Sequence, residues 1–239
     1  ILIISCQSRI KRVNILRNLW VKQLKEFGYK CFFVIGNNYT KETTIINDII
    51  WTNCNDYYEG LPEKIYESLY FIENNFNYKY VFKIDDDCVI NPLQFIRAKL
   101  TKNYIGIPKS IDRDFNRFWH KGKCKDKIKD KIPYPSSRIF INTFHAKGES
   151  GYFLSNIAIR NILSKKKYII SDLYEDKVIG DVLRLNNIIL TKNDLYLPKL
   201  FHTSLIYNNI DIDKFTIIVD IPEELLKKTY DKFRKIKSN

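Results

Sequence analysis

Three consecutive aspartates, Asp85, Asp86 and Asp87, carry the strongest chemical signal in the sequence. They follow the apolar run at residues 78–84, which predicts a buried strand. Because side chains alternate faces along a strand, we expect Asp85 and Asp87 on one side and Asp86 on the other. Two carboxylates on one side favour Mg²⁺ or Mn²⁺, which could bridge the phosphates of a nucleotide. The alternative is that these acids cap a helix that begins near Pro92, but capping needs fewer than three of them.

A second acidic pair, Glu175 and Asp176, opens a predicted helix at residues 176–185. A carboxylate in this position can take the proton of an incoming hydroxyl group as a bond to a sugar forms, and so act as a general base. The alternative is an ordinary acidic first turn that complements the helix dipole. The sequence leaves both interpretations open.

Two weaker signals complete the set of candidate residues. Gly148 and Gly151 precede an apolar segment and allow the backbone to approach a ligand closely. The segment lacks the spaced Gly, Lys and Ser/Thr of a phosphate-binding P-loop. His202, one of three histidines, is either a nitrogen ligand for a metal or a structural residue.

Alternating strands and helices are expected to position these residues. We predict strands at residues 1–5, 30–36, 49–52, 78–84 and 104–107. We predict helices at residues 11–27, 61–74, 156–164, 176–185 and 222–236, and one from residue 92. Such alternation predicts an α/β fold, a Rossmann-like mixed, mostly parallel sheet with helices on both faces. Ligands bind at the carboxyl ends of the strands in sheets of this kind, which is where the three aspartates lie.

Composition limits the class of protein. The chain has 239 residues, of which 45% are hydrophobic, so it can bury a core and is neither disordered nor fibrous. No apolar run approaches the ~20 residues that a membrane span needs. The formal net charge of +13 favours anionic partners: nucleic acid, acidic membrane or phosphorylated small molecules. Part of the excess of lysine has another explanation. It accompanies abundant Ile and Asn, a bias in composition that AT-rich coding sequences produce without any function.

Two further features concern the surroundings of the site. The five cysteines are odd in number and scattered, which favours a reducing, cytoplasmic compartment. Residues 121–131 carry lysine at every second position and interrupt the apolar pattern. We interpret them as a solvated surface loop, with a lid or an acceptor-contacting arm as the alternative.

Five sequence segments, taken in order, resemble the β-1,3-galactosyltransferase and Fringe-like family of inverting glycosyltransferases, which has the GT-A fold. The similar segments are residues 12–20, 56–64, 83–89, 148–155 and 175–180. The third includes the Asp-x-Asp pattern, and the fifth resembles the family's Glu-Asp-Val-x-x-Gly segment. The sequence departs from the family pattern at Val13, Leu19, Gly60, Pro62, Glu149, Ser150 and Lys177.

The resemblance implies one GT-A domain over residues 1–239, with a nucleotide-sugar-binding half at 1–110 and an acceptor and catalytic half at 111–239. It implies a UDP-sugar donor, Mn²⁺ or Mg²⁺, and a glycan, glycolipid or glycoprotein acceptor joined through a β linkage, β-1,3 in particular. Asp176 would be the catalytic base. Asp87 would be the main metal ligand, helped by Asp85 and His202. The remaining implied donor-binding residues are Arg12, Asp56, Lys64, Asp85, Asp86, Gly148 and Glu149.

Two other classes of function stay open. One is a carbohydrate- or nucleotide-sugar-binding module of the same fold that has lost turnover. The other is a basic nucleic-acid-binding or metal-dependent nuclease domain, but most aromatic residues fall in predicted core segments, so no nucleic-acid partner is expected. The resemblance favours the Golgi or ER lumen, against the compartment that the cysteines favour, and an anchor upstream of residue 1 stays open.

Overall fold

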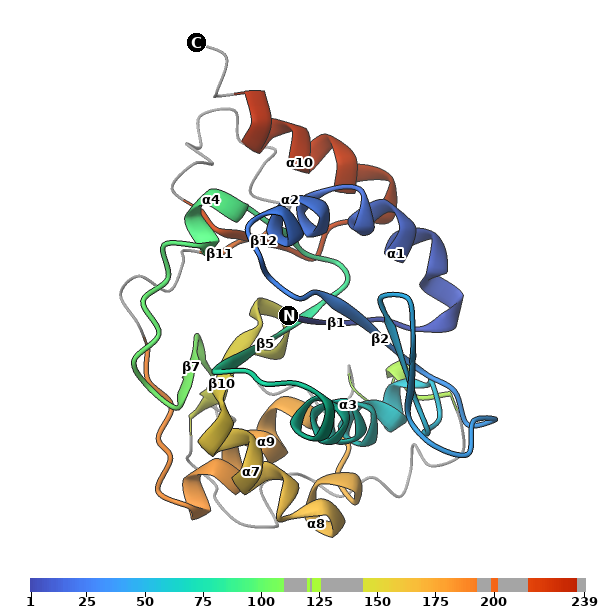
Figure 1. The fold of residues 1–239 in the computed structure, drawn as a ribbon, viewed down its shortest axis with the longest axis vertical. Coiled ribbons are helices and arrows are strands. Elements are labelled where there is room, and N and C mark those ends of the chain that lie inside the picture. The colour runs from blue at the N-terminus through green and yellow to red at the C-terminus, as the bar shows by residue number, and fades with distance from the viewer. Residues whose placement is uncertain (110–119, 121, 126–143, 193–198, 202–214, 236–239) are drawn as a thin grey trace.

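The computed structural model describes residues 1–109, 120, 122–125, 144–192, 199–201 and 215–235 (Figure 1). A seven-stranded sheet lies at its centre, in the order β3-β4-β2-β1-β5-β10-β7. Its strands are β1 (Leu2–Ile4), β2 (Phe32–Gly36), β3 (Thr44–Ile46), β4 (Ile49–Thr52), β5 (Tyr80–Asp85), β7 (Tyr104–Gly106) and β10 (Tyr152–Ser155).

The sheet is mixed and mostly parallel, which confirms the predicted class. Strands β4, β2, β1 and β5 are parallel to one another. Strand β10 is antiparallel to both of its neighbours, so β7 runs in the same direction as β5. In this register Ile4 pairs with Asp85, and Tyr152 pairs with Lys83. The ends of β1 and β5 therefore meet at one edge of the sheet, next to the start of β10.

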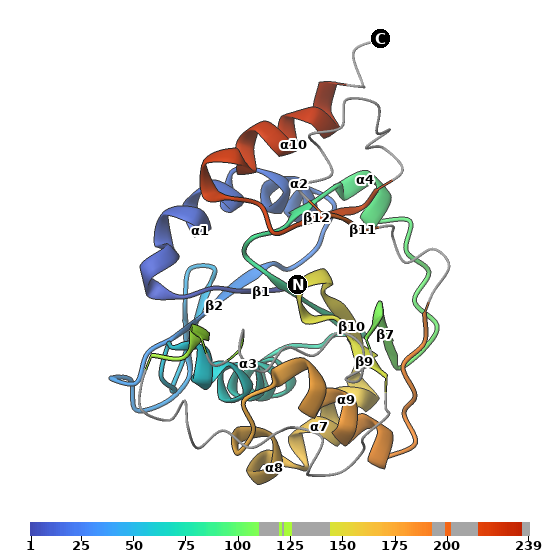
Figure 2. The same cartoon turned by 180° about the vertical axis from the view of Figure 1, so that it is seen from behind.

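Helices cover both faces of the sheet, as predicted (Figures 1 and 2). One layer contains α1 (Ile10–Arg17), α2 (Trp20–Glu26), α4 (Pro92–Phe95) and α10 (Leu226–Lys235). The other contains α3 (Leu61–Asn75), α7 (Asn156–Leu163), α8 (Lys166–Ile170) and α9 (Glu175–Leu185). Each layer has its own core, because strand residues alternate between the faces: Ile3 packs into the first core, and Leu2 and Ile4 pack into the second.

Two small sheets extend this arrangement, and the sequence pattern did not predict them because each strand is only two or three residues long. One has the order β11 (Lys199–Phe201), β12 (Ile217–Val219) and β6 (Val89–Ile90). The other pairs β8 (Pro108–Lys109) with β9 (His145–Ala146). This second pair places Lys109 and His145 beside α9.

The helix predicted at residues 11–27 is interrupted, which corrects the prediction. Helix α1 ends at Arg17, and Leu19 has φ −102° and ψ −121°, outside the helical region. The interruption allows α1 to bury Leu16 while α2 buries Trp20. The indole Nε1 of Trp20 also donates a hydrogen bond to the carbonyl oxygen of Cys88 at 3.1 Å. That contact joins residues 68 positions apart, so local periodicity does not reveal it.

Other predictions concern the surroundings of the fold. All five cysteines lie in the described part of the chain and are free thiols. Within those same ranges, no helix is both long enough and apolar enough to cross a membrane. Most of the predicted loop at residues 121–131 lies outside the described residues, and the division into two halves at residue 110 stays a prediction.

Candidate functional site

A cleft of about 360 Å³ lies at the carboxyl ends of β1 and β5. We call it the aspartate cleft, because Asp85, Asp86 and Asp87 line it, together with Asp56 and Lys64. A smaller pocket of about 100 Å³ adjoins it. We call this one the Asp176 pocket. The residues that line both are Tyr58, Leu61, Asp85 and Lys123. The structure thus brings the two acidic segments, some 90 residues apart, to neighbouring cavities.

Asp86 is directed into the protein and is held by cations. Strand β5 ends at Asp85, and Asp86 and Asp87 form a turn. The Asp86 carboxylate accepts hydrogen bonds from Ser5 Oγ at 2.6 Å and from Arg9 at 2.8 Å. Arg12, which the resemblance placed at the nucleotide, lies 3.5 Å from the same carboxylate. These contacts satisfy Asp86 and fix the turn that carries Asp87.

Asp87 lies in a negative environment. Burial raises the pKa of its carboxyl group to about 6, and the nearby charges of Asp85, Asp86 and Asp220 act in the same direction. Among the described residues, none forms an ion pair with Asp87. A carboxylate in such surroundings gains from a bound cation.

The fit of a metal ion to this cleft can be judged from the donors present. Carboxylate oxygens are hard ligands that suit Mn²⁺ or Mg²⁺, and Mg²⁺ commonly takes one or two protein carboxylates together with water and phosphate oxygens. In the described ranges, no group of three or more His, Cys, Asp or Glu side chains is placed to hold a metal ion. His202, the predicted third ligand, lies outside the described residues. The carboxylates of Asp85 and Asp87 therefore fit a metal as a partial set of ligands.

Asp56 and Lys64 form a buried pair at the wall of the cleft. Lys64 Nζ lies 2.7 Å from Asp56 Oδ1 and donates to the carbonyl oxygen of Ser5 at 2.8 Å. Asp56 also accepts from the backbone N–H of Gly36 at 2.7 Å. The pair joins α3 to the ends of β1 and β2, so it shapes the cleft whether or not it contacts a ligand.

Asp176 lies in the first turn of α9 with 17% of its side chain exposed. Its Oδ2 accepts a hydrogen bond from the backbone N–H of Gly148 at 3.3 Å and lies 3.8 Å from His145 Nε2. Burial by itself would raise the pKa of this carboxyl group, but its interactions with His145, Lys109 and Lys83 lower it below the usual value. Asp176 is therefore ionised at neutral pH, the state that a general base requires.

Gly180 explains why α9 comes so close to β9. A Cβ atom at this position would lie 2.5 Å from the Cβ of His145. Glycine removes that clash and lets the helix pack directly against the strand. This close packing places Asp176, one turn earlier on α9, beside His145.

Sequence reasoning missed a buried network around Lys83. Its ammonium group lies 2.8 Å from Asp85 Oδ1, 3.2 Å from Glu175 Oε2 and 3.4 Å from the carbonyl oxygen of Gly148. The hydroxyl group of Tyr152 donates to the other oxygen of Glu175. A lysine inside an otherwise apolar strand was the available signal, because a buried cation needs carboxylate partners.

His120 is a second residue that the sequence did not single out. It lines the Asp176 pocket, and its Nδ1 lies 2.5 Å from the hydroxyl oxygen of Tyr58. Burial lowers the pKa of His120 to about 4, so the ring is neutral at physiological pH. Glu149, which replaces a small residue of the family pattern, lines the same pocket.

Gly151 allows the backbone before β10 to approach β5. Its φ of +71° and ψ of 169° belong to a region that glycine alone adopts readily, and a Cβ there would lie 2.5 Å from the carbonyl oxygen of Lys83. We expect Gly151→Ala to lower the free energy of unfolding by about 3 kcal/mol, measured by urea denaturation. Gly28→Ala is the control, since Gly28 has φ +87° but nothing within 4 Å of the added atom, and it should cost about 1 kcal/mol. Equal losses in the two variants would contradict the close approach.

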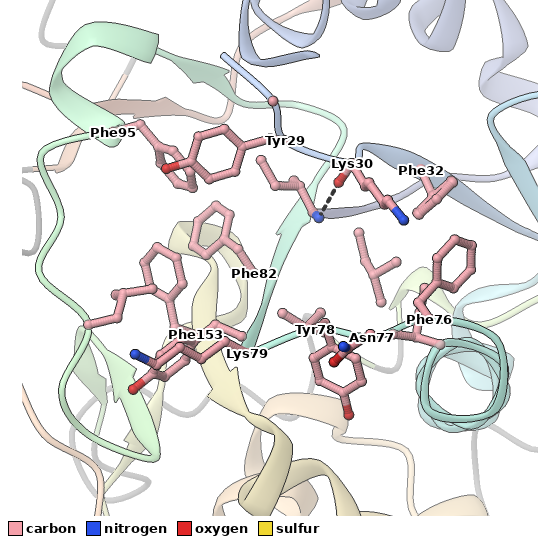
Figure 3. A pocket seen from close by; sticks show the side chains of 17 residues that line it. Tyr29, Lys30, Phe32, Phe76, Asn77, Tyr78, Lys79, Phe82, Phe95 and Phe153 are labelled. Atoms are coloured by element: carbon pink, nitrogen blue, oxygen red, sulfur yellow. Dashed lines mark hydrogen bonds between the residues drawn. The ribbon is translucent and has the colours of Figure 1, made fainter. Parts of the chain in front are cut away.

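A larger pocket, of about 400 Å³, lies at the opposite edge of the sheet, and eight of its 17 lining residues are aromatic (Figure 3). The rings of Tyr29, Phe82, Phe95 and Phe153 gather on one side of it. Of the predicted site residues that the structure describes, none lines this pocket. The predicted site residues that the structure describes therefore lie toward the carboxyl edge of the sheet and not in this aromatic-lined pocket.

Comparison with known proteins places these features in context. The sequence matches the galactosyltransferase family over residues 11–194. The structure is similar to a crystal structure of a glycosyltransferase involved in the glycosylation of the major capsid of PBCV-1. The TM-score is 0.50 and the sequence identity is 12%, and the match covers 97% of this chain and 98% of the other. A search of curated proteins found no match. The structural likeness supports the predicted GT-A-type α/β fold.

Proposed function

Because this chain belongs to the galactosyltransferase family and is a glycosyltransferase, we propose that it moves a hexose or N-acetylhexosamine from a UDP-sugar to an acceptor hydroxyl group. The observation that carries this proposal is the position of Asp176, an ionised and partly exposed carboxylate in a pocket that adjoins the aspartate cleft. A base and an anion-binding cleft side by side suit one displacement at a sugar carbon.

The aspartate cleft would take the diphosphate of the donor. Asp87, with Asp85 and with His202 from outside the described residues, would hold Mn²⁺ or Mg²⁺. A bound metal supplies positive charge that neutralises the diphosphate as it leaves. Arg9 lines the cleft with about half of its side chain exposed, and its cation adds to the attraction for the phosphates.

Asp176 would act on the acceptor. Its carboxylate would accept the proton of the acceptor hydroxyl group as that oxygen attacks the anomeric carbon. The hydrogen bond from the Gly148 N–H holds one carboxylate oxygen in place. Attack from the face opposite the diphosphate gives inversion, and hence a β linkage from a UDP-α-sugar, which the family resemblance narrows to β-1,3. The acceptor is a glycan, free or carried by a lipid or a protein.

The direct test is UDP release from a panel of UDP-sugars, including those of galactose, glucose and N-acetylglucosamine, with Mn²⁺ or Mg²⁺ and a mixture of glycan acceptors. We expect UDP release from one donor to exceed that from the others, to stop with a chelator, and to increase when an acceptor is present. Calorimetry on the same samples tests the alternative function, a binding module that has lost turnover. Tight UDP-sugar binding without any release would identify a binding module and contradict the proposed turnover.

A further inference from the structure

We propose that Lys83 is a positioning residue that fixes the carboxylate of Asp176 relative to the aspartate cleft. The inference rests on the proposed role of Asp176 as the base. Lys83 lies on β5, Asp85 ends the same strand, and Glu175 and Asp176 begin α9. A single buried cation thus lies between the strand that carries the cleft and the helix that carries the base.

The contacts of Lys83 show why it positions other groups instead of binding substrate. Its side chain is 2% exposed, and its ammonium group has three N–H donors. Three oxygen atoms surround these donors: Asp85 Oδ1 at 2.8 Å, Glu175 Oε2 at 3.2 Å and the Gly148 carbonyl at 3.4 Å. The ammonium group is therefore paired within the protein, by two ion pairs and one hydrogen bond.

Lys83 reaches Asp176 by two routes. The first runs through Glu175, which precedes Asp176 in the chain and is 3% exposed, with its other carboxylate oxygen bound by the Tyr152 hydroxyl group. The second runs through Gly148, whose carbonyl oxygen accepts from Lys83 while its N–H donates to Asp176 Oδ2. Both the helix start and one oxygen of the base are therefore held by the same cation.

The network of Asp85, Lys83 and Glu175 depends on the positive charge of the lysine. Lys83 lies between two carboxylates, that of Glu175, which is 3% exposed, and that of Asp85, which is 32% exposed. Without the ammonium group, the two carboxylates lose the cation that joins β5 to α9, and they either repel each other or take up a proton. The first turn of α9 would then move away from the cleft.

The test uses Lys83→Met and Glu175→Gln, with Asp181→Asn as a matched control. Asp181 is also a buried carboxylate of α9 paired with a buried lysine, Lys177, but this pair lies within the helix. We expect both test variants to lower kcat for sugar transfer by about 100-fold, because a displacement near 1 Å can cost that much. The Kd for UDP and Mn²⁺ should change less than about threefold in Glu175→Gln, which leaves the 2.8 Å pair of Lys83 and Asp85 in place. Asp181→Asn should keep kcat within about threefold, measured per folded molecule.

A crystal structure of metal-free Lys83→Met gives a readout that does not depend on activity. We expect the 3.3 Å contact between Gly148 N and Asp176 Oδ2 to be lost while the Lys177–Asp181 pair persists. An unchanged Asp176 in that structure, or unchanged kcat in the two test variants, would overturn the inference. If the unaltered protein releases no UDP from any donor, the proposed function fails, and the crystal structure still decides the role of Lys83.

Discussion

Replacing Asp176 with asparagine is expected to lower kcat for sugar transfer by about 10²- to 10⁴-fold, the usual contribution of a general base. Asparagine has nearly the same shape, and its side-chain oxygen can still accept the hydrogen bond from Gly148. It cannot take up a proton from the acceptor hydroxyl group. Binding of UDP should therefore be unchanged in calorimetry, while UDP release in the presence of acceptor collapses.

Asp172→Asn is the control for this experiment. Asp172 lies just before α9, where its carboxylate accepts hydrogen bonds from the backbone N–H groups of Leu173 and Tyr174, and it does not line the Asp176 pocket. This variant should keep its turnover, because an amide oxygen can accept the same bonds. If Asp176→Asn retains most of its turnover, Asp176 is not the base.

Replacing Asp87 with alanine is expected to weaken metal-dependent UDP binding by at least about 100-fold, since even indirect partners of a metal contribute 10- to 100-fold to affinity. Burial raises the pKa of Asp87, and the neighbouring acids Asp85, Asp86 and Asp220 raise it further, so this carboxylate gains from a cation. Removing it leaves Asp85, which Lys83 already neutralises at 2.8 Å. Titration of UDP with Mn²⁺ and again with a chelator measures the effect.

Asp220→Asn tests whether Asp87, and not the neighbouring Asp220, is the metal ligand. Asp220 has φ +57°, a conformation that asparagine tolerates well, so this variant should fold normally. It should change metal-dependent UDP binding by less than about tenfold. The assignment of Asp87 is wrong if Asp220→Asn abolishes this binding while Asp87→Ala preserves it.

Several parts of the fold and site were predictable because they depend on local patterns. The apolar run of β5 ends at Asp85, and the helix expected at residues 61–74 is α3, Leu61–Asn75. The acidic pair does open a helix, since α9 begins at Glu175. In each case hydrophobic periodicity marks the element, and a change to polar or charged residues marks one of its ends.

Other parts were not predictable because contacts between distant segments decide them. The break between α1 and α2 accompanies the burial of Trp20 and its hydrogen bond to Cys88. Strand β10 carries an apolar run too short to be distinguished from a loop, and its antiparallel pairing with β5 follows from the sheet. Composition and spacing contain no information about such partners.

The sequence by itself determined which residue types stand at the ends of which elements: carboxylates after β5 and at the start of α9, and glycines before β10. The tertiary structure alone decided how these carboxylates divide their roles. Asp86 is paired with Arg9, and Glu175 with Tyr152 and Lys83. One oxygen of Asp85 is paired with Lys83, although Asp85 also lines both cavities, whereas Asp87 and Asp176 each face one of them. The reason is physical: the charge state and the role of a carboxylate depend on the charges and hydrogen-bond donors within a few ångströms of it. Those neighbours come from strands and helices that meet only when the chain folds.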